Sequence, residues 1–171
     1  VKAGGTLVRF AGPRLAAENP VALREDPLLP VVLRQGGRQL GGAMSWDQPK
    51  AIEPFALDGP FAGLTLPPDI RVRAQVLAQP SPDLAARVIA RLQDGTPLIT
   101  RKEAGSGQIV FWHITANTDW SNLPLSGLFL DMLNRLNAAR GWQDEVPLAA
   151  GSVWSPVQVL DGLGKICLLY T

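Results

Sequence analysis

The sequence predicts an α/β or α+β domain with a mixed β-sheet, an antiparallel β-meander and a C-terminal helix that packs on one face of the sheet. Three observations lead to this fold class. A compact apolar run at residues 6–10 is typical of a buried strand. Residues 85–115 contain strand-like segments separated by two tight turn signals. Apolar residues then recur at helical spacing between residues 124 and 140.

The composition is that of one ordinary globular domain. The chain has 171 residues, of which 46% are hydrophobic and 18% charged, and its formal net charge is +1. Because the arginines are scattered along the chain, we expect no binding to nucleic acid. The single cysteine, Cys167, excludes an internal disulfide and a cysteine-based metal site. No apolar run reaches about 18 residues, so we expect no direct membrane insertion by this chain.

Prolines and glycines divide the first part of the chain into short elements. The expected elements are a strand at 6–10, helical turns at 14–18 and 26–29, a strand with a bulge at Gly41-Gly42 within 37–46, and an ordered loop at 49–68 that buries Phe61 and Leu64.

The pattern becomes more regular after residue 69. Apolar and polar residues alternate at 70–76, which predicts a strand. Asp94-Gly95 and residues 104–107 are turn signals, and two tight reversals in series predict the meander. Gly141 is a natural end for the helix that follows. Residues 160–171 predict a final short strand or a disordered tail.

The expected core comes from the apolar residues of these strands and of the helix. Fully burying each such side chain contributes roughly 1.5–3 kcal/mol before conformational entropy is subtracted. The expected core residues are Leu7, Val8, Phe10, Val88, Ile89, Leu98, Ile99, Ile109, Val110, Phe111, Leu128, Phe129, Met132 and Leu136.

His113 is the only histidine and the leading candidate for a catalytic base. It follows an apolar strand segment, and strand ends are where active sites of α/β folds lie. Ser121 is the nearby candidate nucleophile. However, the chain contains no nucleophile elbow of the G-x-S-x-G or G-x-C-x-G kind. We therefore favour a structural histidine that hydrogen-bonds the following loop. The alternative is a hydrolase that uses His113 with Ser121 or with an upstream residue outside this sequence.

A ligand or partner surface is the other candidate site. Trp46, Asp119, Trp120 and Asn122 combine aromatic and polar groups in loop contexts. Buried aromatics that anchor loops are the more common case, and we expect Trp120 to pack under the start of the helix. A small-molecule or glycan binder that uses Trp46 and Trp154 is a further alternative.

The sequence indicates no metal and no cofactor. One histidine and one cysteine cannot supply a usual set of zinc ligands, and the acidic residues lack calcium-loop spacing. The glycine-rich stretch "RQGGRQLGGAMSW" lacks both common phosphate-binding motifs. Turn and bulge glycines explain it better.

The stretches "GGTLVRF" and "DGTPLITRKEAGSGQIVFWHITANTDWSNLPLSGLFLDMLNRL", in this order, resemble class I glutamine-amidotransferase-like domains. They resemble more closely such domains of bacterial membrane proteins that carry a BatA-type aerotolerance-regulator segment with two N-terminal membrane helices. The resemblance covers Gly4 to about Leu136, and "HITANTDWSNLPLSGLF" is its most specific part. It implies a flavodoxin-like domain at 1–145, truncated at its N-terminus, and an irregular extension at 146–171.

The resemblance also indicates which catalytic residues are missing. In active amidotransferases of this class, the last core strand ends in His-Pro-Glu, and the His and Glu work with a Cys on an upstream elbow. His113 stands at a comparable point of this chain, but Ile114 and Thr115 replace the Pro and Glu, and the elbow Cys is absent. Glutamine hydrolysis is therefore not expected.

These observations favour a non-catalytic amidotransferase-like module of a larger bacterial protein anchored in the inner membrane. Its expected role is protein–protein interaction or assembly with an unidentified protein partner. The sequence does not indicate the side of the membrane on which the module lies. The hydrolase and the ligand binder stay open as alternatives.

Overall fold

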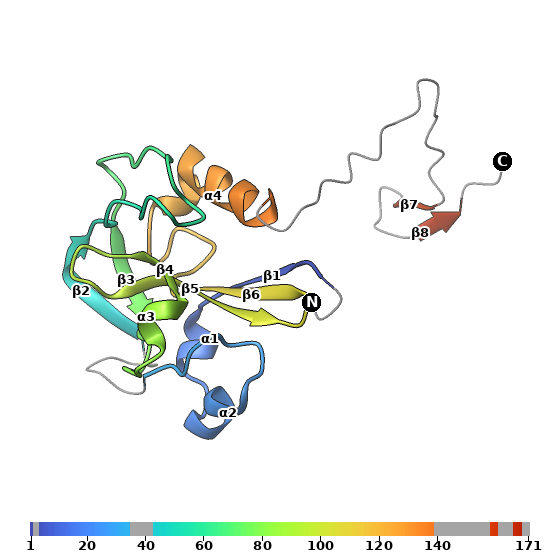
Figure 1. Cartoon of the computed structure of the whole chain (residues 1–171), viewed down its shortest axis with the longest axis horizontal. Helices are drawn as coiled ribbons and strands as arrows, with labels where there is room; N and C mark the ends of the chain where they lie inside the picture. Colours follow the sequence, from blue (N-terminus) through green and yellow to red (C-terminus); the bar gives the residue numbers. More distant parts are fainter. Residues whose placement is uncertain (2–3, 35–42, 139–157, 161–165, 169–171) are drawn as a thin grey trace. The chain divides into compact units, whose positions relative to one another are not determined.

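The structure, a computed structural model, describes residue 1 and residues 4–34, 43–138, 158–160 and 166–168 (Figure 1). The chain divides into two compact units, Val1–Gly141 and Trp142–Thr171. In the second unit, β7 (Gln158–Leu160) pairs antiparallel with β8 (Ile166–Leu168). The strand β8 lies in the stretch for which the sequence predicts a short strand or a tail.

The described part of the first unit contains a four-stranded sheet, a two-stranded sheet and short helices. Its elements follow in the order β1 (Thr6–Phe10), α1 (Pro13–Ala16), α2 (Pro20–Glu25), β2 (Ala43–Lys50), β3 (Val72–Val76), α3 (Leu84–Arg87), β4 (Val88–Arg91), β5 (Pro97–Ala104), β6 (Gly107–Trp112), the 3-10 turn η1 (Leu123–Leu125) and α4 (Gly127–Ala138).

The main sheet has the strand order β1-β6-β5-β4 and is mixed, as the sequence predicts. β1 runs parallel to β6, with Val8 opposite Val110. β4, β5 and β6 form the antiparallel meander. Its turns lie at Asp94-Gly95 and around Gly105, where the turn signals predict them. Both glycines have positive φ, a conformation that glycine adopts without steric cost.

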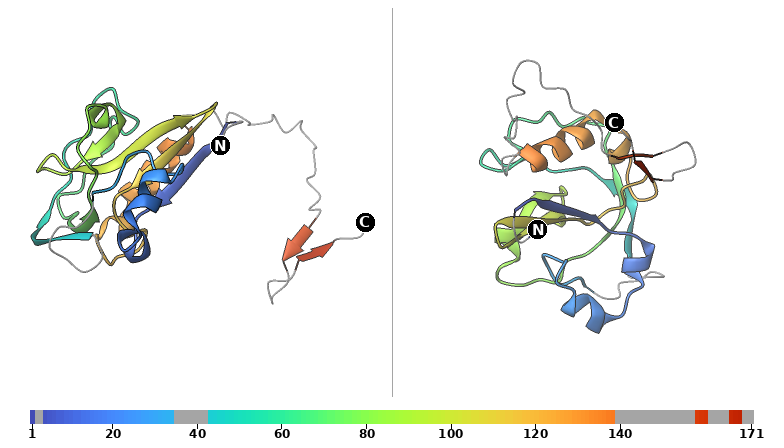
Figure 2. Two further views of the ribbon diagram at one scale, coloured as in Figure 1. Left: turned by 90° about the horizontal axis from the view of Figure 1, so that it is seen from below. Right: turned by 90° about the vertical axis from the view of Figure 1, so that its right-hand side faces the viewer.

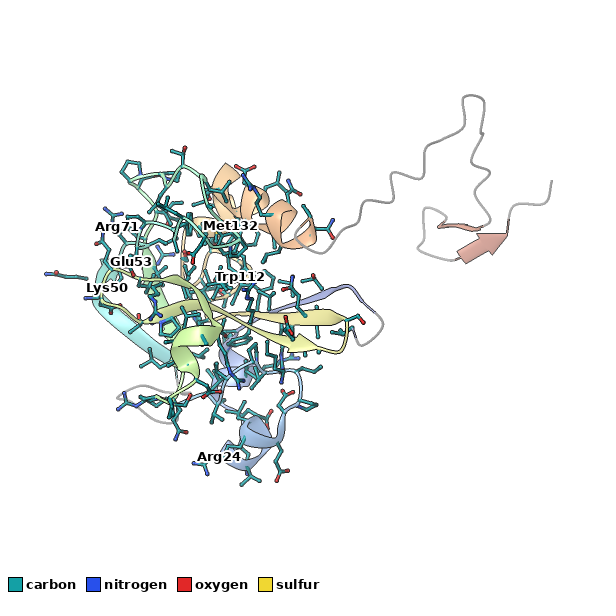
Figure 3. All side chains as sticks on the ribbon, in the orientation of Figure 1. Arg24, Lys50, Glu53, Arg71, Trp112 and Met132 are labelled. Carbon is teal, nitrogen blue, oxygen red and sulfur yellow. The ribbon has the colours of Figure 1, made fainter. Side chains whose placement is uncertain are left out.

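The central strand β6 separates two apolar cores on opposite faces of the main sheet. All its residues are buried. Val110 and Trp112 pack in the first core with residues of α4, whereas Phe111 packs in the second, because side chains alternate along a strand. Figures 1 and 2 show α4 on one side of the sheet and α1 and α2 on the other. Figure 3 shows Met132 of α4 close to Trp112 in the first core.

Most of the predicted core residues are buried: Leu98, Ile99, Ile109, Val110, Phe111, Leu128, Met132 and Leu136. The others are half-buried: Leu7, Val8, Phe10, Val88, Ile89 and Phe129. All of these except Phe129 lie in β1 and β4, the edge strands of the main sheet, which have a neighbour on one side only. In the loop between β2 and β3, Phe61 is buried as predicted and Leu64 is half-buried.

A hydrogen-bonded turn lies at 26–29 as expected, because the N–H of Leu29 donates to the carbonyl oxygen of Asp26 at 3.2 Å. The helix α2, which lies just before this turn, was not expected. The side chain of Asn19 caps α2 by accepting a hydrogen bond from the N–H of Val21 at 2.9 Å. Pro20 occupies the first helical position, where its missing N–H leaves no donor unpaired. Proline therefore begins this helix, and the helix is short, as the division of this region by prolines predicts.

The bounds of other helices and strands differ from the predictions by a few residues. The described strand β2 begins at Ala43 and has its irregularity between Ser45 and Lys50. The bulge predicted at Gly41-Gly42 lies outside the described residues. The short helix α3 occupies the first residues of the segment that we expected to be the first meander strand. A strand therefore starts only at Val88, where the β-branched and apolar residues Val88 and Ile89 begin.

Candidate functional site

His113 directly follows β6 and links the main sheet to β3. Its backbone N–H donates to the carbonyl oxygen of Leu98 at 2.9 Å, and its carbonyl oxygen accepts from the N–H of Val76 at 2.9 Å. Leu98 belongs to β5 and Val76 to β3, so His113 is hydrogen-bonded to strands of both sheets. The residue is fully buried.

Both ring nitrogens of His113 are hydrogen-bonded within the protein. Nδ1 lies 2.8 Å from the carbonyl oxygen of Val76, and Nε2 lies 3.2 Å from Oγ1 of Thr100. A carbonyl oxygen only accepts, so Nδ1 carries the proton and donates it. The hydroxyl of Thr100 then donates to Nε2. The ring is a neutral imidazole whose donor and acceptor are both occupied.

Burial lowers the pKa of His113 from its usual 6.5 to about 4, and the hydrogen bond to Val76 opposes this change in part. The ring of Phe111 meets the imidazole edge-on, with 4.8 Å between the ring centroids. A protonated imidazole would need an acceptor at Nε2 and would carry charge next to this apolar ring. His113 is therefore neutral at pH 7.

Ser121 is buried in the segment that leads to α4. Its Oγ accepts a hydrogen bond from the N–H of Leu123 at 3.0 Å, at the start of η1. Its backbone pairs with Val72 of β3 in an isolated bridge. Within the described ranges, no hydrogen bond joins Ser121 to His113. The two candidate catalytic residues thus have separate partners.

Asp119 and Asn122 flank Trp120 and Ser121 in the sequence. Asp119 is exposed, and its carboxylate accepts from Nδ2 of Asn117 at 2.8 Å. Asn122 bonds to the loop before β3: its Oδ1 accepts from the N–H of Arg71 at 2.7 Å, and its Nδ2 donates to the carbonyl oxygen of Asp69 at 3.0 Å. The side chain of Asn122 therefore fixes that loop to the segment before α4.

Trp120 is only 9% exposed and packs in the second core together with Phe111. The prediction that it packs under the start of the helix is wrong, because Leu123 and Leu128 belong to the first core. Trp120 and Leu123 therefore pack in different cores, although they are close in the sequence. The side chains of Trp46 and Trp154 lie outside the described residues.

Ile114 and Thr115 stand where the resemblance places Pro and Glu. Ile114 is buried in the first core. Thr115 is buried too, and its hydroxyl donates to the carbonyl oxygen of Asn117 at 3.3 Å. The group that orients the imidazole of His113 is the carbonyl of Val76 rather than a carboxylate. Sequence reasoning missed this partner, because a main-chain carbonyl carries no sequence signal.

A cavity of about 620 Å³ lies apart from His113, between α2 with its following loop and the segment that leads into α3. None of the candidate residues from the sequence lines it. Its lining includes three basic side chains that the sequence analysis did not single out: Arg24, Arg87 and Lys102. Figure 3 shows Arg24 reaching outward from α2. Because these residues come from distant segments, no local motif indicates them.

Among the residues that the structure describes, no group of His, Cys, Asp and Glu side chains gathers as a metal ion would require. In the same ranges, no helix has the length and apolar character needed to cross a membrane.

No family model matches the sequence, and no curated protein matches it. Among solved structures, the chain is similar to the cytoplasmic protein STM3548 from Salmonella typhimurium, with a TM-score of 0.60 and 16% identity. The similarity covers 82% of this chain and 56% of that chain, so this chain spans little more than half the length of that protein. At this identity the similarity shows the mixed α/β fold alone. The amidotransferase-like resemblance stays a prediction.

Proposed function

We propose that this domain is a non-catalytic amidotransferase-like module of a larger, membrane-anchored bacterial protein, and that it acts in protein–protein interaction or assembly. The hydrogen bonding of His113 carries the proposal. The ring is buried, and Val76 and Thr100 occupy its two nitrogens. A histidine bonded in this way stabilises the junction of two sheets and has no nitrogen left for a substrate.

The hydroxyl of Thr100 lies beside Nε2 of His113, as a nucleophile lies beside a general base. However, Thr100 and His113 are both fully buried, so a substrate has no access to either group. Ser121, the nucleophile of the alternative hydrolase, is buried and accepts from Leu123 instead. No observation therefore favours the hydrolase over the non-catalytic module.

A binding surface built on tryptophans also lacks support in the described residues. Trp120 is a core residue, and Asn122 is engaged with the main chain of the loop before β3. Of the candidate surface residues with described side chains, Asp119 is the exposed one. A single carboxylate does not favour a glycan or another small molecule.

Two exposed leucines, one at the end of η1 and one in α4, support the interaction role. Leu125 is 77% exposed and Leu130 is 60% exposed. Leu130 lies on the face of α4 opposite to the buried residues Leu128 and Met132, as helical spacing requires. Exposed apolar surface marks protein contact sites when it is contiguous, and these two leucines are the candidates in η1 and the N-terminal half of α4. We assign the partner contact to this edge of the helix.

A glutaminase assay tests the non-catalytic part of the proposal. The purified chain and its His113→Asn variant are incubated with glutamine, and the released ammonia is measured. We expect the same background release from both proteins. Ammonia release that depends on His113 would overturn the proposal.

Cross-linking in membranes that contain the full-length parent protein tests the interaction part. We expect wild-type protein to give cross-linked partner peptides, and the double variant Leu125→Asp/Leu130→Asp to lose them. Asn134→Asp is the control, because Asn134 is exposed on α4 and the change adds a carboxylate without removing a leucine. Equal cross-linking of all three proteins would contradict the assignment of this surface.

A further inference from the structure

We propose that the cavity between α2 and α3 binds a small organic anion, whose carboxylate or phosphate group contacts Lys102 and Arg87. A volume of about 620 Å³ suits a small-molecule ligand, since such pockets typically measure about 300–1,000 Å³. The site is separate from His113 and independent of the interaction role proposed above.

Two consecutive carbonyls of one loop hold the two cations at the cavity. Nζ of Lys102, on β5, donates to the carbonyl oxygen of Leu29 at 2.6 Å. Nη1 of Arg87, at the end of α3, donates to the carbonyl oxygen of Pro30. Both side chains line the cavity. The loop after α2 thus positions an ammonium and a guanidinium on the same wall.

Both cations keep donors that these bonds do not use. An ammonium has three N–H groups, and one of those of Lys102 is bonded to Leu29. A guanidinium has five N–H groups, and the contacts of Arg87 with Pro30 and with the carboxylate of Asp83 do not use all of them. The planar fork of a guanidinium and an adjacent ammonium are the donors that carboxylate and phosphate oxygens prefer.

The positive charge of Lys102 is not neutralised within the described part of the protein, where no carboxylate lies within ion-pair distance of it. Burial and the charge of Arg87 lower the pKa of Lys102, and Asp26 opposes this in part. Asp26 itself is paired with Arg9 at 2.5 Å. An oxyanion placed between Lys102 and Arg87 would relieve the repulsion between them.

Three acidic side chains line the cavity: Glu25 is exposed, and Asp83 and Asp26 have partners of their own. Besides its contact with Arg87, Asp83 accepts from the hydroxyl of Ser81 at 2.7 Å. Asp26 also accepts from the N–H of Leu28 at 2.8 Å. These bonds hold the carboxylates in place and lower the pKa of both Asp83 and Asp26. Neither carboxylate forms an ion pair with Lys102.

The remaining lining indicates an apolar body next to the anionic group. Aliphatic and proline side chains also line the cavity: Leu23, Pro27, Val31, Val32 and Pro80. Inorganic phosphate would contact the cations but leave this surface in water, whereas an organic phosphate or carboxylate would cover it. The chemistry therefore points to an organic anion.

The first test is an NMR titration of the 15N-labelled 171-residue chain with phenyl phosphate and with benzoate. We expect saturable shifts of the amides of residues 29–32, 79–81 and 102 with at least one of these probes. Benzyl alcohol, which lacks the charge, and inorganic phosphate, which lacks the ring, should each bind at least tenfold more weakly. Absence of saturation by both organic anions, or shifts confined to other residues, would overturn the proposal.

The second test compares two neighbouring residues of β5. Lys102→Gln should weaken binding of the better probe by about tenfold or more, because a charge-assisted hydrogen bond is lost. Arg101→Gln removes the same charge from the exposed face of the strand and should change the affinity by less than about twofold. Equal weakening in both variants would mean that binding reflects net charge only, and would overturn the site. If Lys102→Gln does not fold, the amide shifts of the wild-type chain decide whether the probe binds in this cavity.

Discussion

His113 and Lys102 are both titratable groups partly or wholly removed from water, and their surroundings differ in one respect. Both ring nitrogens of His113 have protein partners, and burial keeps the ring neutral. Lys102 bonds to Leu29 but lies beside Arg87 at a cavity. A buried polar group whose bonds are complete fixes the fold, whereas a cation whose bonds are incomplete leaves room for a ligand. The comparison separates a structural histidine from a binding lysine.

The largest expected effect is that of His113→Leu on stability. The change leaves the hydroxyl of Thr100 and the carbonyl of Val76 without partners, and each buried group left unpaired costs about 1–3 kcal/mol. We therefore expect the free energy of unfolding at pH 7 to fall by about 2–5 kcal/mol in urea denaturation. His113→Asn should recover part of this loss, because its amide nitrogen can replace Nδ1. A loss below about 0.5 kcal/mol for His113→Leu would contradict the structural role.

Acid should destabilise the protein through the same residue. The pKa of His113 is about 4 in the folded chain and about 6.5 when unfolded, so between these values the unfolded chain binds more protons. Stability is full above pH 6.5 and falls as the pH approaches 4, by about 3 kcal/mol at most. The pKa values of Asp26 and Asp83 lie below their usual 3.8, so protonation of these carboxyls lowers the stability only below this pH window.

Urea denaturation at several pH values between 4 and 7 measures this dependence. The His113→Asn variant is the control, because it has no imidazole to protonate. Its stability should change much less over the same range. Parallel curves for the two proteins would indicate that other groups, rather than His113, determine the acid sensitivity.

A smaller loss is expected for Asn122→Ala. This variant removes the hydrogen bonds to the main chain of Arg71 and Asp69, but the loop is close to water, which can replace them in part. We expect a loss of about 1–2 kcal/mol and faster hydrogen exchange of the Arg71 amide. Asp119→Ala, at an exposed neighbouring position, should change stability by less than about 0.5 kcal/mol. Equal losses in the two variants would argue against a specific role of Asn122.

The fold was more predictable than the site because its signals are local. Asp94-Gly95 determines a turn by its own conformational preference, and the alternation around Val72 depends on adjacent residues. The helix α2 escaped prediction because Pro20 was treated as a helix breaker, although its position after a capping Asn19 makes it a helix start. The prediction considered proline as a residue type and did not consider that Pro20 stands at the first position of the helix.

The contacts of the candidate site depend on the tertiary fold. His113 is a single conspicuous residue in the sequence, but its partners Val76 and Thr100 lie 37 and 13 residues away. The cavity is less visible still, since Arg87, Lys102 and the loop after α2 meet only after α3 and β5 have packed. Long-range convergence of this kind has no periodicity, so a single sequence does not reveal it.

The smallest expected effect on stability is that of Lys102→Gln. The variant weakens one hydrogen bond to Leu29, which costs about 0.5–1.5 kcal/mol. It also removes a partly buried charge and its repulsion with Arg87, and both changes favour the folded chain. The terms oppose one another, so the free energy of unfolding should change by less than about 1 kcal/mol in urea denaturation. A loss as large as that of His113→Leu would mean that Lys102 fixes the loop after α2, and the distinction between the two residues would fail.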